Sequence, residues 1–489
     1  MTFHLGDMKT FLLLFGGCFV AFWASMITLN AADPVVIHEW GTFTCLQDEQ
    51  GRAIGGINVD DEPVPGFVCF PGGIQVAAQY SHEVGNFGLP PYSNGKGWVP
   101  GDPSVTMRLE TPVVYIYPPK GQKPQSVPPL DVHVDFHGGL LSQYYPFAHN
   151  ESSLSGNEGL TDQTTSGLTW KGVRIGSAGK PVETSDKVWT IPREVSAPLL
   201  EVPVHLQSAD GVIHDDIQVE HFLFYRGIGH FESPLIVAPN GADKKGEMEI
   251  GAPAIRNSFA KFDWAWMVEI RPDGSCAFHS LHNPEAGFVT GMVAWFPNIS
   301  ASFTDHDFSA DNLIRLKTSM QEALVKEGLY PNEASAMLRT WELSYFKSPG
   351  LRFFYTVPRA WVDRVLPLQI TGAPTEITRV MVGRIELITE TQRAALARLA
   401  AGPCPNLAAV KKSAEEVLQN SKLPKDQIEA FYRGEKPLSE LGIAIPPLVQ
   451  DYLDLGRFRD ALVLHEQREH QSPALAQLIK DNQIGPQGN

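Results

Sequence analysis

Three side chains of metal-binding types alternate along one predicted strand. His133 and Asp135 occupy every second position of residues 132–136, and His137 continues the pattern. Because successive side chains of a β-strand point to opposite faces, the three project together. Two imidazoles and a carboxylate suffice for an open zinc or iron site. The interpretation that we favour is that the three side chains form the solvated polar face of an amphipathic strand, because antiparallel sheets commonly have one face in water. A metal site is the alternative interpretation.

Basic residues concentrate in residues 339–398. This segment holds nine Lys and Arg against five Asp and Glu, a net charge of +4 in a chain whose net charge is −16. Arg359, Arg364, Arg379 and Arg384 could bind an anion, because a guanidinium binds a carboxylate or phosphate through two parallel hydrogen bonds. The same residues could instead form an interdomain contact with the acidic N-terminal part, which is the interpretation we favour.

A short helix is predicted over residues 359–366. Arg359 and Asp363 lie four positions apart and are expected to pair along its surface. Arg364 has no such partner within the helix, so we expect it to reach another element or an anion.

Sequence motifs of known enzyme classes are missing. The sequence contains no nucleophile elbow, phosphate-binding loop or dinucleotide fingerprint. His38 and Glu39 could act as an acid/base pair, but a structural role is favoured, with Trp40 and Phe43 anchoring a first strand in the core. The sequence leaves open whether the protein is an enzyme, and it indicates no cofactor.

The composition is that of a globular protein. Of 489 residues, 43% are hydrophobic and 19% are charged, which excludes a disordered, collagen-like or polytopic membrane protein. The net charge of −16 argues against nucleic acid as a partner, since nucleic acid needs a basic surface.

The first 31 residues predict a secretory signal peptide. Residues 11–29 are uncharged and mostly apolar, Lys9 precedes them, and small residues follow at Ala31 and Ala32. The alternative is an uncleaved membrane anchor formed by residues 11–29. Either way the protein is expected to be exported, to the periplasm or the extracellular space. Of the cysteines that remain after cleavage, Cys45 and Cys69 are the pair most suited to a disulfide.

Glycine and proline divide the chain. Residues 32–306 hold 30 Gly and 25 Pro, whereas residues 307–489 hold 10 and 13. The first part predicts a β-rich domain of sandwich or jelly-roll type. Its strands include residues 217–225 and a hairpin over residues 264–281.

Two smaller parts are expected to follow the β-rich domain. Residues 307–400 predict a small α/β module, whose helices begin after Ser309 and at Pro331. Residues 401–489 predict a helical C-terminal region.

Four segments carry a resemblance to other proteins. They are HEWGTFT at residues 38–44, RLETPVVY at 108–115, FLFYRG at 222–227, and VPRAW at 357–361 with DRVLPL at 363–368. The chain resembles, over most of residues 35–400, an uncharacterised family of exported bacterial proteins. The family has no assigned activity, so the resemblance implies export and no catalytic residue. His133 and His137 are not part of the shared pattern.

Two functions are compatible with these observations. The leading hypothesis is an exported, non-catalytic binding or surface-associated protein whose partner is a glycan or another extracytoplasmic molecule. The alternative is a metal-dependent hydrolase with its site in the β-rich domain. Contact with a membrane is expected only through an uncleaved N-terminal segment.

Overall fold

A computed structural model describes most of the chain after the predicted signal peptide. The described residues are 33–59, 64–71, 87, 89–90, 96–154, 159–207, 213–241, 246–254, 260–432, 434 and 436–486. The predicted export signal lies outside them. Residues 34–489 form one compact unit.

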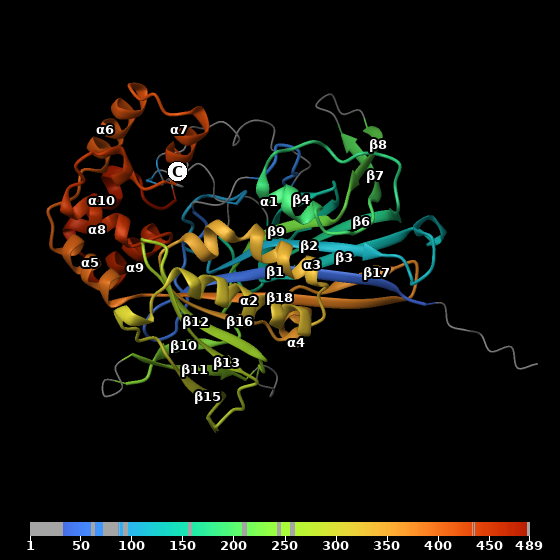
Figure 1. Cartoon of the computed structure of the whole chain (residues 1–489), viewed down its shortest axis with the longest axis horizontal. Helices are drawn as coiled ribbons and strands as arrows, with labels where there is room; N and C mark the ends of the chain where they lie inside the picture. The colour runs from blue at the N-terminus through green and yellow to red at the C-terminus, as the bar shows by residue number, and fades with distance from the viewer. Residues whose placement is uncertain are drawn as a thin grey trace, which may run out of the picture. The chain divides into compact units, whose positions relative to one another are not determined.

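An eight-stranded sheet runs through this unit, with the first strand near its middle (Figure 1). Its strands in spatial order are β13 (Cys276–His282), β12 (Trp264–Ile270), β16 (Gly350–Thr356), β18 (Thr375–Leu387), β1 (Val35–Gln47), β2 (Met107–Tyr117), β9 (Leu223–Gly229) and β4 (Gly139–Tyr145). β1 pairs antiparallel with β2 and parallel with β18, from Val35 opposite Thr375 to Gln47 opposite Leu387. The sheet therefore combines strands from both sides of the predicted domain boundary at residue 306.

Two smaller sheets share a hydrophobic core with one face of the large sheet. The six-stranded sheet contains β17 (Leu368–Thr371), β3 (Leu130–His137), β6 (Thr165–Ile175), β7 (Leu200–Gln207) and β8 (Ile213–Glu220), with β5 (His149–Ser152) paired to β6. The four-stranded sheet contains β10 (Ile236–Pro239), β11 (Glu247–Pro253), β15 (Val293–Ser300) and β14 (Phe288–Thr290). Phe43 of β1, Val134 of β3 and Ile250 of β11 belong to this common core.

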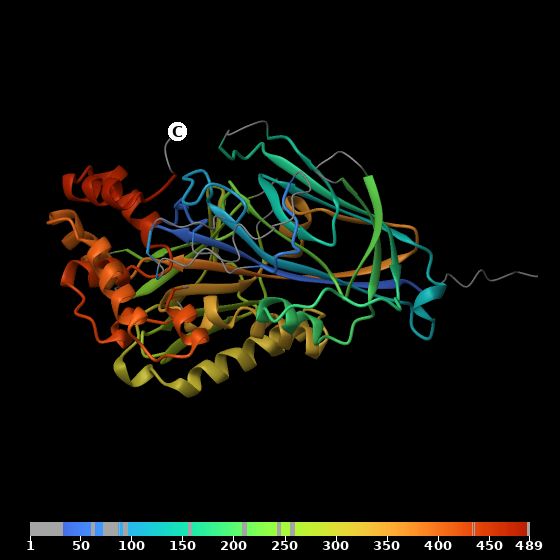
Figure 2. The same cartoon turned by 90° about the horizontal axis from the view of Figure 1, so that it is seen from above.

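Helices cover the opposite face of the large sheet (Figure 2). They are α1 (Lys187–Arg193), α2 (Ala310–Lys326) and α3 (Pro331–Thr340), followed by the π-helical turn η3 (Glu342–Lys347). Trp40 packs edge-on against Trp341 at a centroid distance of 5.6 Å. A second core therefore lies between the sheet and these helices.

A helical region follows β18. It contains α5 (Glu390–Ala401), α6 (Leu407–Gln419), α7 (Lys425–Tyr432), η4 (Leu438–Leu441), α8 (Pro447–Asp454), α9 (Arg459–His470) and α10 (Pro473–Asn482). The remaining short helices are η1 (Pro124–Ser126), η2 (Asp305–Asp307) and α4 (Arg359–Val365). Ion pairs connect the helices of this region to one another and to the segment after β1. Arg393 of α5 binds both Glu49 and Glu466, and Arg398 of α5 binds Asp451 of α8. Within the described ranges, no helix has both the length and the hydropathy needed to cross a bilayer.

The predicted fold class is confirmed. The chain is β-rich in its N-terminal part, α/β elements follow, and helices fill the C-terminal region. The predicted hairpin is formed by β12 and β13. The Ser309 hydroxyl accepts a hydrogen bond from the Asn312 amide at the start of α2, and Pro331 opens α3. These elements can be predicted from sequence because helix capping and turn formation depend on neighbouring residues.

The strand predicted over residues 217–225 is wrong. β8 ends at Glu220 and β9 begins at Leu223, and the two strands belong to different sheets. The Glu220 carboxylate is buried, and it accepts hydrogen bonds from the Trp189 indole at 2.8 Å and from Arg193 at 2.6 Å. The chain changes sheets beside this fixed carboxylate, which the apolar pattern on either side does not reveal.

The suggested pairing of Cys45 with Cys69 is also wrong, because both are free, buried thiols. Cys45 lies on β1, whereas Cys69 bridges to Tyr144 of β4, and β2 and β9 lie between these strands. Cys69 lies beyond β4, so four strand spacings, roughly 19 Å, separate the two cysteines. A disulfide requires Cα atoms within about 7 Å of each other.

Candidate functional site

The alternation of β1 distributes its polar side chains over both faces of the large sheet. Glu39 points toward the core shared by the three sheets, and His38, Thr42 and Thr44 point toward the helices. All four side chains are buried. A buried polar group needs a partner, so each face must supply one.

On the inter-sheet face, Glu39 is the centre of a buried ion pair. It accepts hydrogen bonds from Arg379 of β18 and from the hydroxyl of Tyr225 of β9. Arg379 also reaches Asp363 of α4 at 3.0 Å, and Asp363 in turn binds Arg359 at 2.8 Å. The predicted pair of Arg359 and Asp363 is confirmed. The network connects three strands to α4, and the Arg379 Nη2 atom is buried without a hydrogen-bond partner among the described residues.

On the helix-covered face, His38 binds Glu333 and not its neighbour Glu39. The His38 Nδ1 atom lies 2.7 Å from Glu333 Oε2, and the Tyr117 hydroxyl donates to Glu333 Oε1 at 2.7 Å. Glu333 Oε2 also accepts from the Tyr330 amide at the start of α3. Since neighbouring residues of a strand face opposite sides, the suggested His38–Glu39 acid/base pair does not form.

Farther along the same face lies a buried arginine cluster, which we define as Arg108, Arg226, Arg352 and Arg384. Each side chain is at most 1% exposed. Arg226 donates to Gln143, and Arg108 Nη1 donates to the Ile57 and Val59 carbonyls at 3.2 Å. Strand register brings the cluster together, because Thr44 of β1 lies opposite both Arg108 of β2 and Arg384 of β18.

Glu386 is shared by two members of the cluster. Its Oε1 atom lies 2.5 Å from Arg384 Nε and 3.2 Å from Arg352 Nε. Arg352 also donates to the Tyr345 and Ser348 carbonyls. Burial lowers the pKa of Arg352 to about 10, and the Glu386 carboxylate opposes that decrease. Arg352 therefore remains charged at neutral pH.

Arg384 carries two buried nitrogens, Nη1 and Nη2, that find no hydrogen-bond partner among the described residues. The Tyr345 ring lies against its guanidinium, 4.6 Å from centroid to carbon. The hydroxyls of Tyr345, Thr42 and Thr44 are buried as well, and in the described part of the chain they have no partner in good geometry. Burial and the Glu110 carboxylate raise the pKa of Tyr345, and Arg384, Thr42 and Thr44 oppose that increase, which places these groups together.

Hydrogen-bond donors thus outnumber acceptors around Tyr345. The indole N–H groups of Trp40 and Trp341 are buried without a described partner too, and Trp341 stacks on Tyr345 at 5.0 Å. Unsatisfied buried donors are uncommon in native proteins and require an explanation. An oxyanion, whose atoms only accept hydrogen bonds, matches this donor-rich set of Arg384, Thr42, Thr44 and Tyr345.

The structure places His133, Asp135 and His137 on the outward face of β3, as the alternation predicted. His133 Nε2 lies 3.0 Å from Asp135 Oδ1, and His133 Nδ1 lies 2.8 Å from the Thr169 hydroxyl. His137 instead contacts the Arg364 carbonyl at 2.9 Å. Across the described ranges, no group of three His, Cys, Asp or Glu residues is arranged to hold a metal ion.

The four arginines proposed from sequence do not form one site. Arg359 and Arg379 share Asp363 on the inter-sheet side, whereas Arg384 belongs to the opposite face. Arg364 is half-buried at the end of α4. Basic residues of the 339–398 segment do reach acids of the N-terminal part, because Arg339 binds Glu194, Arg379 binds Glu39, and Arg393 binds Glu49.

Sequence reasoning missed most of the buried arginine cluster. Arg108 and Arg226 stand within segments already singled out for their resemblance, and Arg352 lies in an otherwise apolar strand. A charged residue at an inward position of an apolar strand is a usable signal, because such a charge must be paired or bound. Tyr345 could not be recognised from sequence as a site residue, because an aromatic residue on the apolar face of a helix is expected to belong to the hydrophobic core.

Outside the buried arginine cluster, two carboxyl groups lie close together at the end of α2, where Glu327 faces Asp263. Burial and the Asp263 carboxylate raise the pKa of Glu327 from 4.5 to about 7. A carboxyl with a raised folded-state pKa binds its proton more tightly when folded, so stability falls as the pH rises from about 4.5 to about 7. We expect Glu327→Gln to flatten this pH dependence and to be more stable than wild type at pH 8 by about 1 kcal/mol, a value reduced for partial exposure. Urea unfolding at pH 5 and pH 8 measures both effects, and parallel stability curves for the two proteins would contradict the prediction.

No family model and no curated protein matches the chain. Among solved structures, it is similar to the Fcho1 Mu homology domain of Danio rerio with bound Eps15 peptide, at 7% sequence identity and a TM-score of 0.23. The alignment covers 73% of this chain and 98% of that chain. A likeness this weak carries no inference about fold or function.

Proposed function

We propose that the protein is a non-catalytic binding protein that holds an oxyanion group of its ligand at Arg384, Thr42, Thr44 and Tyr345. The observation that carries the proposal is the buried Arg384 guanidinium, whose two terminal nitrogens have no described partner. Leaving buried N–H groups of a guanidinium without acceptors is unfavourable even when its Nε atom is paired, and a bound carboxylate, phosphate or sulfate would supply the missing acceptors. An acidic glycan is one extracytoplasmic ligand that presents such a group.

A binding role agrees with the surroundings of Arg384 better than a catalytic one. The neighbouring groups are guanidinium, hydroxyl and indole donors, and the two nearby carboxylates are held by cations, Glu386 by Arg352 and Arg384 and Glu110 by Lys96 and Arg108. A general base needs a free acceptor within reach of a substrate proton. Donors that are held rigidly by strand register and aromatic stacking fit recognition of an anion.

Tyr345→Phe tests the proposal because it removes one hydroxyl and leaves the ring. We expect the ligand-free variant to be as stable as wild type or more stable by about 1 kcal/mol, since an unsatisfied buried hydroxyl is destabilising. We also expect a smaller rise in melting temperature on addition of phosphate, sulfate or glucuronate at constant ionic strength. Thermal unfolding measures both quantities.

Tyr115→Phe is the matched control. Tyr115 is buried on the same face, but its hydroxyl donates to the Pro192 carbonyl at 2.9 Å. Its loss should destabilise the protein by about 1 kcal/mol and leave the response to anions unchanged. If Tyr345→Phe destabilises like the control and all three anions act equally on both variants, the hydroxyl is satisfied by water and the proposal is wrong.

A further inference from the structure

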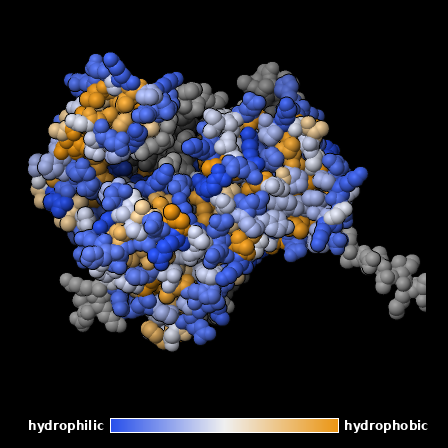
Figure 3. Space-filling view, viewed as in Figure 1, coloured by the Kyte–Doolittle hydropathy of each residue, from blue (hydrophilic) through white to orange (hydrophobic). Residues whose placement is uncertain are grey.

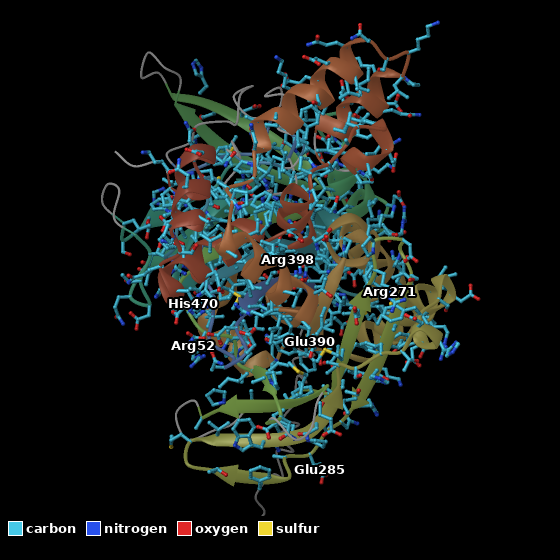
Figure 4. The ribbon with its side chains drawn as sticks, turned by 90° about the vertical axis from the view of Figure 1, so that its left-hand side faces the viewer. Arg52, Arg271, Glu285, Glu390, Arg398 and His470 are labelled. Carbon is cyan, nitrogen blue, oxygen red and sulfur yellow. The ribbon has the colours of Figure 1, made fainter. Side chains whose placement is uncertain are left out.

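The hairpin of β14 and β15 presents large apolar side chains to solvent. Phe288 is 61% exposed, Val289 is 54% exposed and Met292 is 61% exposed. Gly291 adopts a φ of +60° in the turn, which brings Thr290 opposite Val293. The hairpin forms one edge of the four-stranded sheet, and Glu285 marks its base in Figure 4. A small hydrophobic patch is visible at the lowest tip of the molecule in Figure 3.

The hairpin is also uncharged. Residues 286–304 contain no Asp, Glu, Lys, Arg or His, between Glu285 and Asp305. At the 19% charged fraction of the whole chain, a stretch of this length would carry about four charges. Trp295 pairs with Phe288 across the strands, with ring centroids 6.4 Å apart. Tryptophan is enriched at the interface between lipid and water.

We propose that this hairpin docks the protein onto an electrically neutral lipid surface. Phe288, Val289 and Met292 would enter the interface, with the Phe288–Trp295 pair at headgroup depth. Insertion must be shallow, because the outer edge of β14 has backbone groups that need hydrogen-bond partners. Membrane contact would then arise within the folded part of the chain, in addition to any contact made by residues 11–29.

A lipid surface fits the hairpin better than a second copy of the chain. The three exposed side chains offer on the order of 300 Å² together. A stable protein–protein interface buries about 800 Å² on each partner. Anionic lipid is disfavoured because the protein is itself strongly acidic, with a net charge of −16.

Co-sedimentation with phosphatidylcholine vesicles tests the proposal. The protein beginning at residue 33 is suitable, because residues 34–489 form one compact unit and the apolar N-terminal run is then absent. We expect wild type to partition onto the vesicles equally at 50 mM and 500 mM salt. Phe288→Ser combined with Met292→Ser should reduce the partition coefficient at least tenfold, and circular dichroism should show an unchanged fold.

Ile314→Ser is the matched control, since Ile314 is 66% exposed on α2, away from the hairpin. It should bind vesicles like wild type. Three results would overturn the proposal: no binding of wild type to neutral vesicles, binding that requires anionic lipid and disappears in salt, or equal binding by the double variant. Concentration-dependent dimerisation that is lost in the double variant would assign the hairpin to a second copy instead.

Discussion

A fragment comprising residues 307–400 is expected to remain unfolded when it is produced alone. Its strands β16 and β18 lie inside the eight-stranded sheet, between β12 and β1, so isolation leaves both outer edges without partners. Arg379 would also lose Glu39, its buried counter-ion. Unpaired edges and exposed apolar faces favour aggregation over a stable monomer. We expect no cooperative transition in urea and no fixed near-ultraviolet circular dichroism.

The matched experiment is complementation. Co-production of residues 32–306 with residues 307–489 restores every strand of the sheet, so a soluble complex with cooperative unfolding is expected. A soluble, monomeric 307–400 fragment with a sigmoidal unfolding curve would show that this segment folds independently, and the boundary at residue 306 would then separate two domains.

Glu39→Gln is expected to destabilise the protein by about 3 kcal/mol, because it leaves a buried guanidinium without its principal counter-charge. The substitution keeps the shape of the side chain and an acceptor for the Tyr225 hydroxyl, so the charge is the main change. Among the described acidic residues, Arg379 then retains the ion pair with Asp363, whose side chain is 45% exposed. Equilibrium unfolding in urea measures the loss.

Two variants separate charge from packing. Arg359→Gln breaks an exposed pair with the same Asp363, so a loss of at most about 0.5 kcal/mol is expected. The double variant Glu39→Met with Arg379→Met replaces the buried pair with apolar side chains and should recover most of the stability of wild type. A loss below 1 kcal/mol for Glu39→Gln would mean that water reaches and solvates Arg379.

Local chemistry explains what the sequence predicted correctly. The caps at Ser309 and Pro331 depend on neighbouring residues, and so does the turn between β12 and β13. Trp40 and Phe43 do anchor the first strand, but they anchor it on opposite faces, in two different cores. The alternation of side chains along a strand does not show whether one face or both faces will be covered, because that depends on which distant segments pack against the strand.

Long-range pairing explains what the sequence could not predict. Nothing near Glu39 indicates that its partner is Arg379, and nothing near His38 indicates Glu333. The donor set around Arg384 arises because β1 and β18 align in one particular parallel register, and a shift of one residue would turn Arg384 to the other face. Sequence reasoning identified Arg384 as a candidate anion contact but placed it with Arg359 and Arg379, from which the sheet separates it.

The parallel pairing of β1 with β18 also sets an order of assembly during synthesis. Glu39 and Arg379 are 340 positions apart. A ribosome adding 5–20 residues per second needs roughly 20–70 s to cover that distance. β2 emerges early and can cover one edge of β1, while the other edge stays unpaired until β18 (Thr375–Leu387) has been made. Closure of the sheet is therefore a late event with high contact order, and folding is expected to be slow because distant segments must meet before the central strand is enclosed.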